Sequence, residues 1–255
     1  MIKIIKKRLD HLLFEKYLTE SRSKAQSLIM SGVVYVNEKK ETKSGSLHNI
    51  NSSIQIRKKE DEWVSRGSFK LLEAIKYFNI SVDGKICLDI GSSTGGFTQV
   101  LLNQNAKKIY SVDVGKNQLH EKLKKNKKII SLEKTNARYL TKDQIKDPID
   151  ILVCDVSFIS LKKVIKPNLF LLNNISKILV LIKPQFETNV KNLRKGVVKS
   201  HLVHKTICDE IKLWFDSFEQ MKFEGIIKSP IKGPKGNVEF LLCCNFINNV
   251  SNDQQ

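Results

Sequence analysis

Long apolar runs, paired cysteines and acidic residues are all scarce in this 255-residue chain. No stretch approaches the roughly 20 consecutive apolar residues of a membrane span. Residues 1–7 lack both a long hydrophobic region and a small-residue cleavage site, so we expect no signal peptide. The five cysteines are odd in number, and no two form a CxxC pair. This disfavours disulfides and zinc sites, so we expect a cytoplasmic protein with buried, reduced thiols and no metal.

Acidic side chains are outnumbered, because 26 Asp and Glu face 44 Lys and Arg, and the formal net charge is +18. Such a surface attracts polyanions and gains affinity by releasing their counterions, so nucleic acid is the first partner to consider. The excess is uneven, since residues 1–60 carry +7 and the other 195 residues carry +11. A codon bias toward lysine also produces a basic chain, so charge alone leaves a merely solvated surface open.

The first segment has the pattern of a small α+β unit. Apolar residues between 9 and 17 follow helical spacing, and Ser21 can cap a second helix. β-branched and aromatic residues at 33–36, and alternating isoleucines at 54–56, predict short strands. We therefore predict one domain over residues 1–58.

From residue 68 the pattern changes to apolar strands alternating with helices, which is typical of a mostly parallel sheet with helices on both faces. We predict strands at 86–90, 108–112, 129–132, 151–154, 178–182, 223–228 and 238–242. The fold class that follows is α/β, with a Rossmann-like domain over residues 68–247. A charged linker at 59–67 precedes it, and a polar tail at 248–255 follows it.

A turn of small residues, Gly91 to Gly96, joins the first of these strands to a helix. Glycines let a backbone pass close to a ligand, but dinucleotide enzymes share such turns. Three details favour S-adenosylmethionine as the cofactor. Asp89 precedes the turn, where a diphosphate would be repelled. The spacing is GxxxGG rather than GxGxxG. Asp113 ends the next strand, where its carboxylate can accept hydrogen bonds from ribose hydroxyls.

A nicotinamide enzyme would also use an acid at that strand end, and a tight turn without any ligand is the structural alternative. Asn136 follows the third strand, where methyltransferases often contact adenine, although a simple turn explains it equally well. The candidate cofactor-binding residues are Asp89, Gly91, Ser92, Ser93, Thr94, Gly95, Gly96, Phe97, Asp113 and Asn136.

Four ionisable residues fall where a doubly wound sheet would gather them. Lys70 lies on the first helix of this domain, Asp155 and Lys183 follow strands, and Glu239 lies on a late strand. A hydroxyl is a poor nucleophile until its proton is lost or shared, and a methyl donor must be approached in line. A lysine can take such a proton where desolvation and nearby positive charge favour the neutral amine, while carboxylates orient it. Surface ion pairs are the alternative for any one of the four.

Residues 7–56 resemble a known RNA-binding domain. The order RLDHLL, SRSKAQSLIMSG and VVYVNEKKETK is similar to the small domain first recognised in ribosomal protein S4. In that family the corner before the second helix presents a basic face to RNA, so the resemblance implies phosphate contacts that position the RNA. The RNA-binding residues that it implies are Arg8, Ser21, Arg22, Lys24, Lys40 and Lys43. The alternative is that these charges only solvate a small helical surface.

A second resemblance covers nearly the whole chain. The motifs SRGSFKL, DIGSSTGGFT, CDVSFISL, LIKPQFE and GNVEFLL closely resemble the TlyA proteins, ribosomal RNA 2'-O-methyltransferases whose catalytic half is similar to the FtsJ/RrmJ enzymes. The family's Lys-Asp-Lys-Glu tetrad carries over to Lys70, Asp155, Lys183 and Glu239. The resemblance implies methyl transfer from S-adenosylmethionine to a ribose 2'-hydroxyl. We expect Lys183 to take the hydroxyl proton or to weaken its bond to oxygen. Asp155 would orient Lys183, and Lys70 and Glu239 would hold the ribose and tune this pair.

The resemblance also implies a substrate, a cytidine of ribosomal RNA in a ribosomal subunit. The chain ends soon after the last predicted strand, as in shorter members of the family, so we expect large-subunit RNA, and the small subunit stays open. A ribosome-assembly factor that only holds RNA is the first alternative, against which the complete tetrad argues. The family's older label, haemolysin, implies membrane lysis, which the lack of a spanning segment disfavours. A small-molecule methyltransferase would leave the basic N-terminal segment unexplained.

His201 and His204 lie three apart, but without a third ligand we expect packing rather than metal binding.

Overall fold

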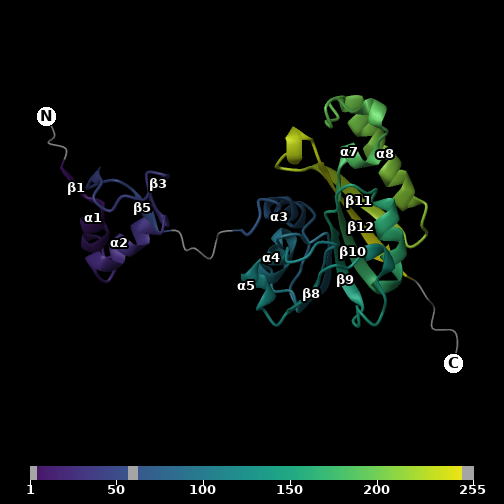
Figure 1. Ribbon diagram of the computed structural model, residues 1–255, viewed down its shortest axis with the longest axis horizontal. Helices are drawn as coiled ribbons and strands as arrows, with labels where there is room; N and C mark the ends of the chain where they lie inside the picture. The colour runs from purple at the N-terminus through teal and green to yellow at the C-terminus, as the bar shows by residue number, and fades with distance from the viewer. Residues whose placement is uncertain (1–4, 57–62, 249–255) are drawn as a thin grey trace. The chain divides into compact units, whose positions relative to one another are not determined.

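The computed structural model describes residues 5–56 and 63–248, and the chain divides into two compact units, Met1–Glu62 and Trp63–Gln255 (Figure 1). Of the predicted linker, residues 59–62 lie outside the described part, and so do residues 249–255 of the predicted tail. Residues 63–67, which we expected to be linker, belong to the larger unit. Trp63 and Val64 pack against its hydrophobic core.

The smaller unit is built from two short helices and five three-residue strands. Its elements are β1 (Lys6–Arg8), α1 (Leu9–Glu15), α2 (Arg22–Met30), β2 (Val34–Val36), β3 (Lys39–Glu41), β4 (Leu47–Asn49) and β5 (Ile54–Ile56). β2 is the central strand between β3 and β5, and β1 pairs with β4. Both predicted helices are present, and Ser21 caps the second, because its Oγ accepts a hydrogen bond from the Lys24 amide at 3.1 Å. Strands β1, β3 and β4 were not predicted, because their residues are mainly polar and exposed.

The larger unit contains one seven-stranded sheet in the order β11-β12-β10-β9-β6-β7-β8. Its strands are β6 (Ile86–Ile90), β7 (Lys108–Val112), β8 (Ile129–Leu132), β9 (Ile149–Cys154), β10 (Leu172–Ile182), β11 (Met221–Lys228) and β12 (Phe240–Ile247). β12 pairs antiparallel with β10 and with β11, and the other pairings within this sheet are parallel. The predicted α/β fold class is confirmed.

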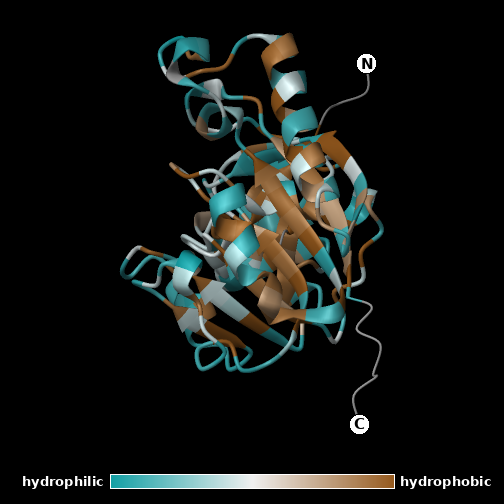
Figure 2. Cartoon of the chain, turned by 90° about the vertical axis from the view of Figure 1, so that its right-hand side faces the viewer, coloured by the Kyte–Doolittle hydropathy of each residue, from teal (hydrophilic) through white to brown (hydrophobic). Residues whose placement is uncertain are grey.

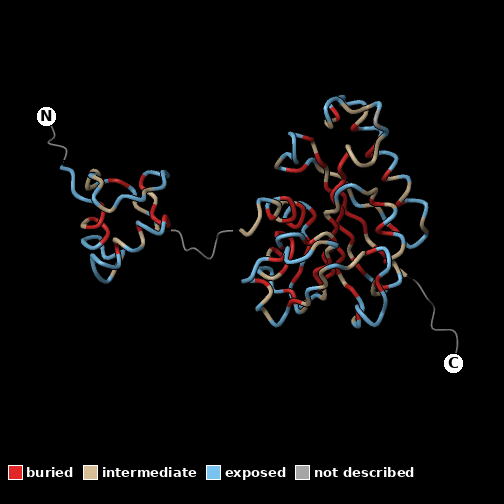
Figure 3. The backbone as a smooth tube through the Cα atoms, viewed as in Figure 1, coloured by how far each residue is buried: buried red, intermediate tan, exposed pale blue. Residues whose placement is uncertain are grey.

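Helices cover both faces of this sheet, and alternate residues of each strand face different layers. On β6, Cys87 joins the core beneath α3 (Ser68–Tyr77) and α4 (Gly96–Asn103), whereas the next residue, Leu88, joins the core beneath α8 (His201–Asp216). The remaining helical elements are α5 (Glu121–Lys124), η2 (Ala137–Tyr139), α6 (Lys162–Ile165), η3 (Lys166–Leu171), α7 (Pro184–Glu187), η4 (Val190–Asn192) and η5 (Pro234–Gly236). The central strands are strongly hydrophobic in Figure 2 and carry much of the buried backbone in Figure 3. A sheet buried on both faces explains why its strands read as continuous apolar runs.

The cysteines are free and buried, as predicted, and burial raises the pKa of the Cys208 thiol to about 12. His204 is buried against the ring of Phe240, with its Nε2 at 3.0 Å from the carbonyl oxygen of Val198. Within residues 5–56 and 63–248, no three His, Cys, Asp or Glu side chains gather as metal ligands would. Over the same residues, every helix is too short or too polar to cross a bilayer.

Candidate active site

Two adjoining cavities open at the edge of the sheet where the parallel strands end. The first has a volume of about 420 Å³ and the second about 240 Å³. Four residues line both of them, namely Gly91, Ser93, Asp155 and Ser157. Because β6 and β9 are neighbours in the sheet, the turn after β6 and the loop after β9 form the boundary between the cavities.

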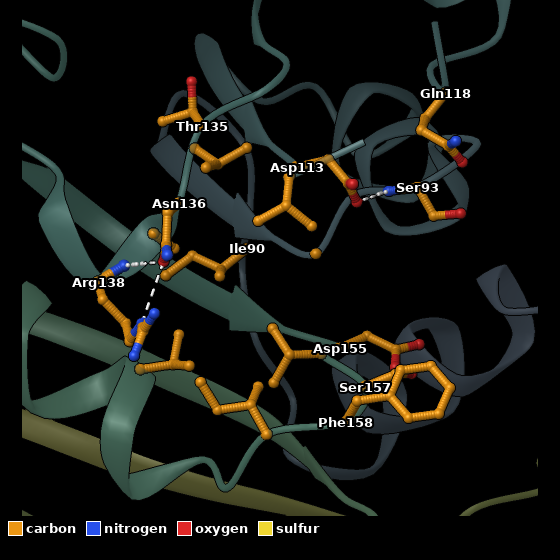
Figure 4. A pocket seen from close by; sticks show the side chains of 17 residues that line it. Ile90, Ser93, Asp113, Gln118, Thr135, Asn136, Arg138, Asp155, Ser157 and Phe158 are labelled. Atoms are coloured by element: carbon orange, nitrogen blue, oxygen red, sulfur yellow. Dashed lines mark hydrogen bonds between the residues drawn. The ribbon is translucent and has the colours of Figure 1, made fainter. Parts of the chain in front are cut away.

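Gly91 is required where these two strand ends meet. Its φ is +82°, and a β-carbon at this position would come within 2.6 Å of the carbonyl oxygen of Asp155. The turn then approaches β7, where the amide of Ser93 donates to Oδ2 of Asp113 at 2.8 Å (Figure 4). The amide of Gly115 donates to the other oxygen, Oδ1, at 2.7 Å. The Asp113 carboxylate is therefore held in place, and each oxygen keeps a lone pair for a ligand hydroxyl.

The first cavity brings together four of the predicted cofactor-binding residues, Gly91, Ser93, Asp113 and Asn136. The Asn136 side-chain oxygen accepts a hydrogen bond from the backbone amide of Arg138 at 3.1 Å and so begins η2 (Figure 4). Prediction missed several lining residues, which include Val114, Gln118, Thr135 and Phe158. They lie in loops after strands and form no pattern that sequence alone could single out.

The second cavity contains the rest of the glycine turn together with three members of the predicted tetrad. Ser92, Thr94, Gly96 and Phe97 line it, as do Lys70, Asp155 and Lys183. Ser65, Arg66, Gly67, Gly233 and Pro234 also line it and are not among the candidate site residues. Among the ten candidate cofactor-binding residues, Gly95 and Asp89 line neither cavity. Gly95 has a φ of +97° and packs against Leu119 and Leu123, so its place in the turn is structural.

Asp89 is fully buried beneath the glycine turn. The hydroxyl of Thr98 donates to its Oδ2 at 2.6 Å, and a second hydroxyl, that of Ser111, lies 2.8 Å from Thr98 Oγ1. Its other oxygen, Oδ1, has no hydrogen-bond partner among the described residues. Burial raises the pKa of Asp89 to about 7, because the charged carboxylate is poorly solvated there. Asp89, a candidate cofactor-binding residue, thus lies behind the walls of both cavities.

The four residues of the predicted tetrad come together at the second cavity. Asp155 lies between two lysines, since its Oδ1 is 2.5 Å from Nζ of Lys183 and its Oδ2 is 3.6 Å from Nζ of Lys70. Lys70 also donates to Oε2 of Glu239 at 2.7 Å. Both lysines are 7% exposed and Glu239 is 1% exposed, so these are not surface ion pairs. Two positive and two negative groups alternate here, and each buried charge has an opposite partner.

Glu239 precedes β12, whereas we predicted it within a strand at 238–242. Because β12 is antiparallel, its first residue lies beside the last residue of β10, where Phe240 pairs with Ile182. A residue just before β12 and one just after β10 therefore reach the same edge of the sheet. Ser157 is a further polar neighbour that prediction missed, and its Oγ accepts a hydrogen bond from Nζ of Lys183 at 2.8 Å.

In the smaller unit, one buried acid organises two of the predicted RNA-binding residues. The Asp10 carboxylate accepts hydrogen bonds from Arg8 at 3.0 Å, from Arg22 at 3.2 Å and from Gln26 at 2.8 Å. The Arg8 guanidinium holds the pKa of Asp10 well below its usual range. Asp10 was not predicted, because an acid inside a basic segment carries no sign of its role. The other four candidates, Ser21, Lys24, Lys40 and Lys43, are exposed.

Two family models match the chain. The model of the FtsJ-like methyltransferase matches residues 63–246, and that of the S4 domain matches residues 7–47. The chain is 42% identical to Hemolysin A of Brachyspira hyodysenteriae, over 92% of this chain and 98% of that one. It is 35% identical to the 16S/23S rRNA (cytidine-2'-O)-methyltransferase TlyA of Mycobacterium tuberculosis, over 92% and 88%. It is 34% identical to the 23S rRNA (cytidine-2'-O)-methyltransferase TlyA of Campylobacter jejuni, over 88% and 94%.

The larger unit, with its sheet order, glycine turn and paired cavities, is the part that the first model covers. The smaller unit is the part that the second model covers. Both domains occur in the order that the sequence resemblance implies. The chain therefore belongs to the TlyA family of FtsJ-like methyltransferases that carry an S4 domain.

Proposed function

We propose that the protein transfers a methyl group from S-adenosylmethionine to the 2'-hydroxyl of a cytidine in ribosomal RNA. One observation carries the proposal: two buried lysines share the carboxylate of Asp155 at the boundary of two cavities. One cavity suits a nucleoside-containing cofactor, and the other suits the sugar that receives the methyl group. The names of the two TlyA relatives support the cytidine 2'-oxygen as the acceptor.

The first cavity fits S-adenosylmethionine in size and in chemistry. Its volume of about 420 Å³ falls in the range of small-molecule sites. Asp113 would accept the ribose hydroxyls, Asn136 would contact the adenine, and the turn from Gly91 to Ser93 would pass close to the methionine portion. When bound, the cofactor supplies a methyl group on a positively charged sulfur. The carboxylates of Asp113 and Asp155 both line this cavity and favour a cationic ligand.

The tetrad would prepare the hydroxyl for attack. In its neutral form, Lys183 would accept the hydroxyl proton at Nζ, while Oδ1 of Asp155 holds the amine in position. Lys70, held by Glu239, would donate a hydrogen bond to the ribose and fix its orientation. Because both lysines are almost fully buried, little water competes for these hydrogen bonds.

We further propose that the S4 domain positions the RNA through Arg8, Ser21, Arg22, Lys24, Lys40 and Lys43. Its partner would be a ribosomal subunit in the cytoplasm. The large subunit is favoured, because the names of both TlyA relatives include 23S rRNA, and the small subunit is possible because one of them also includes 16S. Phosphate contacts of this kind fix the register of the RNA, and the methyltransferase cavity then selects the nucleotide.

The decisive experiment maps ribose methylation across both ribosomal RNAs in a strain that lacks the gene. We expect one cytidine of the large-subunit RNA to lose its methyl group and to regain it with the wild-type gene. An unchanged map would favour the alternative, an assembly factor that only holds RNA.

The assignment of the base is tested with Lys183→Ala. Loss of a general base typically lowers turnover by a factor of about 10² to 10⁴, and we expect cofactor binding to persist. Lys177→Ala is the matched control, because this lysine lies on β10, the strand that Lys183 directly follows, and pairs with Glu224 rather than with the tetrad. A Lys183→Ala protein with full methylation would remove the assignment.

A further inference from the structure

A wide, open groove lies on the methyltransferase domain beside the cofactor cavity. Its volume is about 710 Å³. The residues that line it are Arg138, Lys162, Lys163, Lys166, Pro167 and Trp214. Four of the six are cations, and none of the described residues that line it is acidic. The groove therefore has a strongly positive wall.

None of these cations is in an ion pair within the described part of the domain, although Glu187 lies near enough to Lys162 to interact with it electrostatically. Among the residues that the structure describes, no acid forms an ion pair with Lys162, Lys163, Lys166 or Arg138, and the Arg138 Nε donates only to Asn136, at 3.3 Å. Other lysines of the same domain do pair, for example Lys108 with Asp147 at 2.6 Å. Unpaired cations gathered along one groove provide a site for an anion of extended shape.

Trp214 adds an aromatic surface to this groove. It lies on α8 and is partly exposed, and its ring packs edge to face against Phe215 and Phe218, with centroids 5.0 Å apart in both cases. The indole is thus held by rings behind it, while part of it faces the groove. Nucleobases stack on aromatic side chains held in this way, and adjacent cations contact the phosphates.

The groove continues directly from the cofactor cavity. Arg138 lines both of them, so it marks the point where one ends and the other begins. The short helix α6 also lines both sites, because Val164 lines the cofactor cavity while Lys162 and Lys163 line the groove. The groove shares no lining residue with the second cavity, so a strand whose ribose lies there passes the mouth of the cofactor cavity before it reaches Arg138 and the groove.

We infer that this groove binds a single-stranded segment of the substrate RNA, with the lysines at its phosphates and Trp214 stacked on one base. The inference rests on the proposed function, because it takes the RNA substrate as the ligand. It adds a second RNA contact that belongs to the methyltransferase domain and lies outside the S4 domain. A polyanion without bases, such as an acidic protein segment, would use the lysines and leave Trp214 unused.

The lysines are tested with the triple variant Lys162→Ala, Lys163→Ala, Lys166→Ala of the full chain. Its matched control is Lys85→Ala, Lys107→Ala, Lys128→Ala, three exposed lysines that directly precede β6, β7 and β8 at the opposite edge of the sheet. The probe is a short oligocytidylate, whose affinity is measured against salt concentration. We expect the groove variant to bind at least about tenfold more weakly and its salt slope to fall by about 2, since each phosphate contact to a single strand contributes about 0.7. Equal slopes for the groove variant, the control variant and the wild type would overturn the inference.

Trp214 is tested by fluorescence in a Trp63→Phe background, where it is the single remaining tryptophan. We expect oligocytidylate to quench its emission, and polyglutamate at equal charge to leave it unchanged. Lack of quenching by oligocytidylate would show that no base stacks there and would also overturn the inference.

Methyl transfer to ribosomal subunits from the gene-deletion strain separates this inference from the proposed function. If the wild type transfers no methyl group, the proposed function fails whatever the groove binds. If the wild type transfers methyl groups and the groove variant shows an unchanged KM for subunits, only the groove inference fails.

Discussion

Gly233 lies directly against the carboxylate of Glu239, and a β-carbon at position 233 would overlap Oε1 of that residue. The backbone at Gly233 has a φ of −73°, which any residue can adopt, so only the lack of space requires glycine there. The turn that carries Gly233 thus sets where the carboxylate of Glu239 can lie. That position decides whether Glu239 reaches Lys70, which is 2.7 Å away.

Gly233→Ala is therefore expected to lower turnover strongly while the fold persists. The methyl group would push Glu239 away from Lys70, and a displacement of about 1 Å at a reacting centre can cost about a hundredfold in rate. Steady-state kinetics of methyl transfer, together with the thermal midpoint, measures this effect.

The control for that prediction is Gly236→Asn in the same turn. Gly236 has a φ of +83°, which asparagine tolerates, and a β-carbon added there would meet no atom within 4 Å. We expect near wild-type turnover from it. Equal activity of the two variants would refute the steric argument.

The raised pKa of Asp89 predicts that the stability of the folded protein depends on pH. Burial raises its pKa to about 7 in the folded protein, against about 3.9 in an unfolded chain. The folded state therefore retains a proton that the unfolded state releases, so folding becomes less favourable as the pH rises from about 4 to about 7. Asp89→Asn has no such proton to lose, and its amide oxygen can still accept from Thr98.

As the pH rises from about 4 to about 7, we therefore expect the thermal midpoint of Asp89→Asn to rise relative to that of the wild type. Above about pH 7 the difference between the two should stay constant. Asp83→Asn, which changes an exposed carboxylate, should show no such trend. A constant difference for Asp89→Asn from pH 4 to pH 8 would contradict the prediction.

Asp10→Asn is expected to destabilise the S4 domain and weaken RNA binding. The buried carboxylate holds Arg8 and Arg22 by charge-assisted hydrogen bonds, which a neutral amide replaces only weakly. Because the pKa of Asp10 is depressed, its contribution is complete at neutral pH and is lost as the pH falls well below 4.

Hydrogen exchange of α1 and α2, and the affinity for ribosomal RNA, measure the effect of Asp10→Asn. Glu15→Gln is the control in the same unit, because the Lys7–Glu15 pair is more than 40% exposed on both sides and should contribute little. If both variants exchange like the wild type, Asp10 does not organise the basic face.

Sequence predicted the three strands at 86–90, 108–112 and 129–132 with the bounds observed for β6, β7 and β8. Each is a short apolar run between turn residues, and burial on both faces selects such runs. Strand β10 begins at Leu172, six residues before the predicted start at 178, because its first half is mostly polar. The ladder with β9 is also irregular between Leu172 and Lys177. The first half of β10 is a strand because of the neighbouring strands with which it pairs, and a local sequence pattern contains no information about those neighbours.

The tetrad could be predicted because each member lies inside a recognisable motif. The roles of Ser157, Gly233 and Asp10 could not be predicted, because they depend on contacts that only the folded chain creates. Gly233 matters through the carboxylate of Glu239, and Ser157 matters through the amine of Lys183. The cofactor turn was predicted as a set, but its members divide between two cavities and a structural position at Gly95, which only the folded backbone reveals.

The antiparallel strand β12 also has a consequence for protein synthesis. Glu239 follows Lys70 by 169 residues. β12 lies between β10 and β11, so β11 cannot join the sheet before β12 has been made. A nascent polypeptide contains Lys70, Asp155 and Lys183 well before it contains the acid that holds Lys70. Translation must therefore have passed position 239 before the full set of ionisable groups exists.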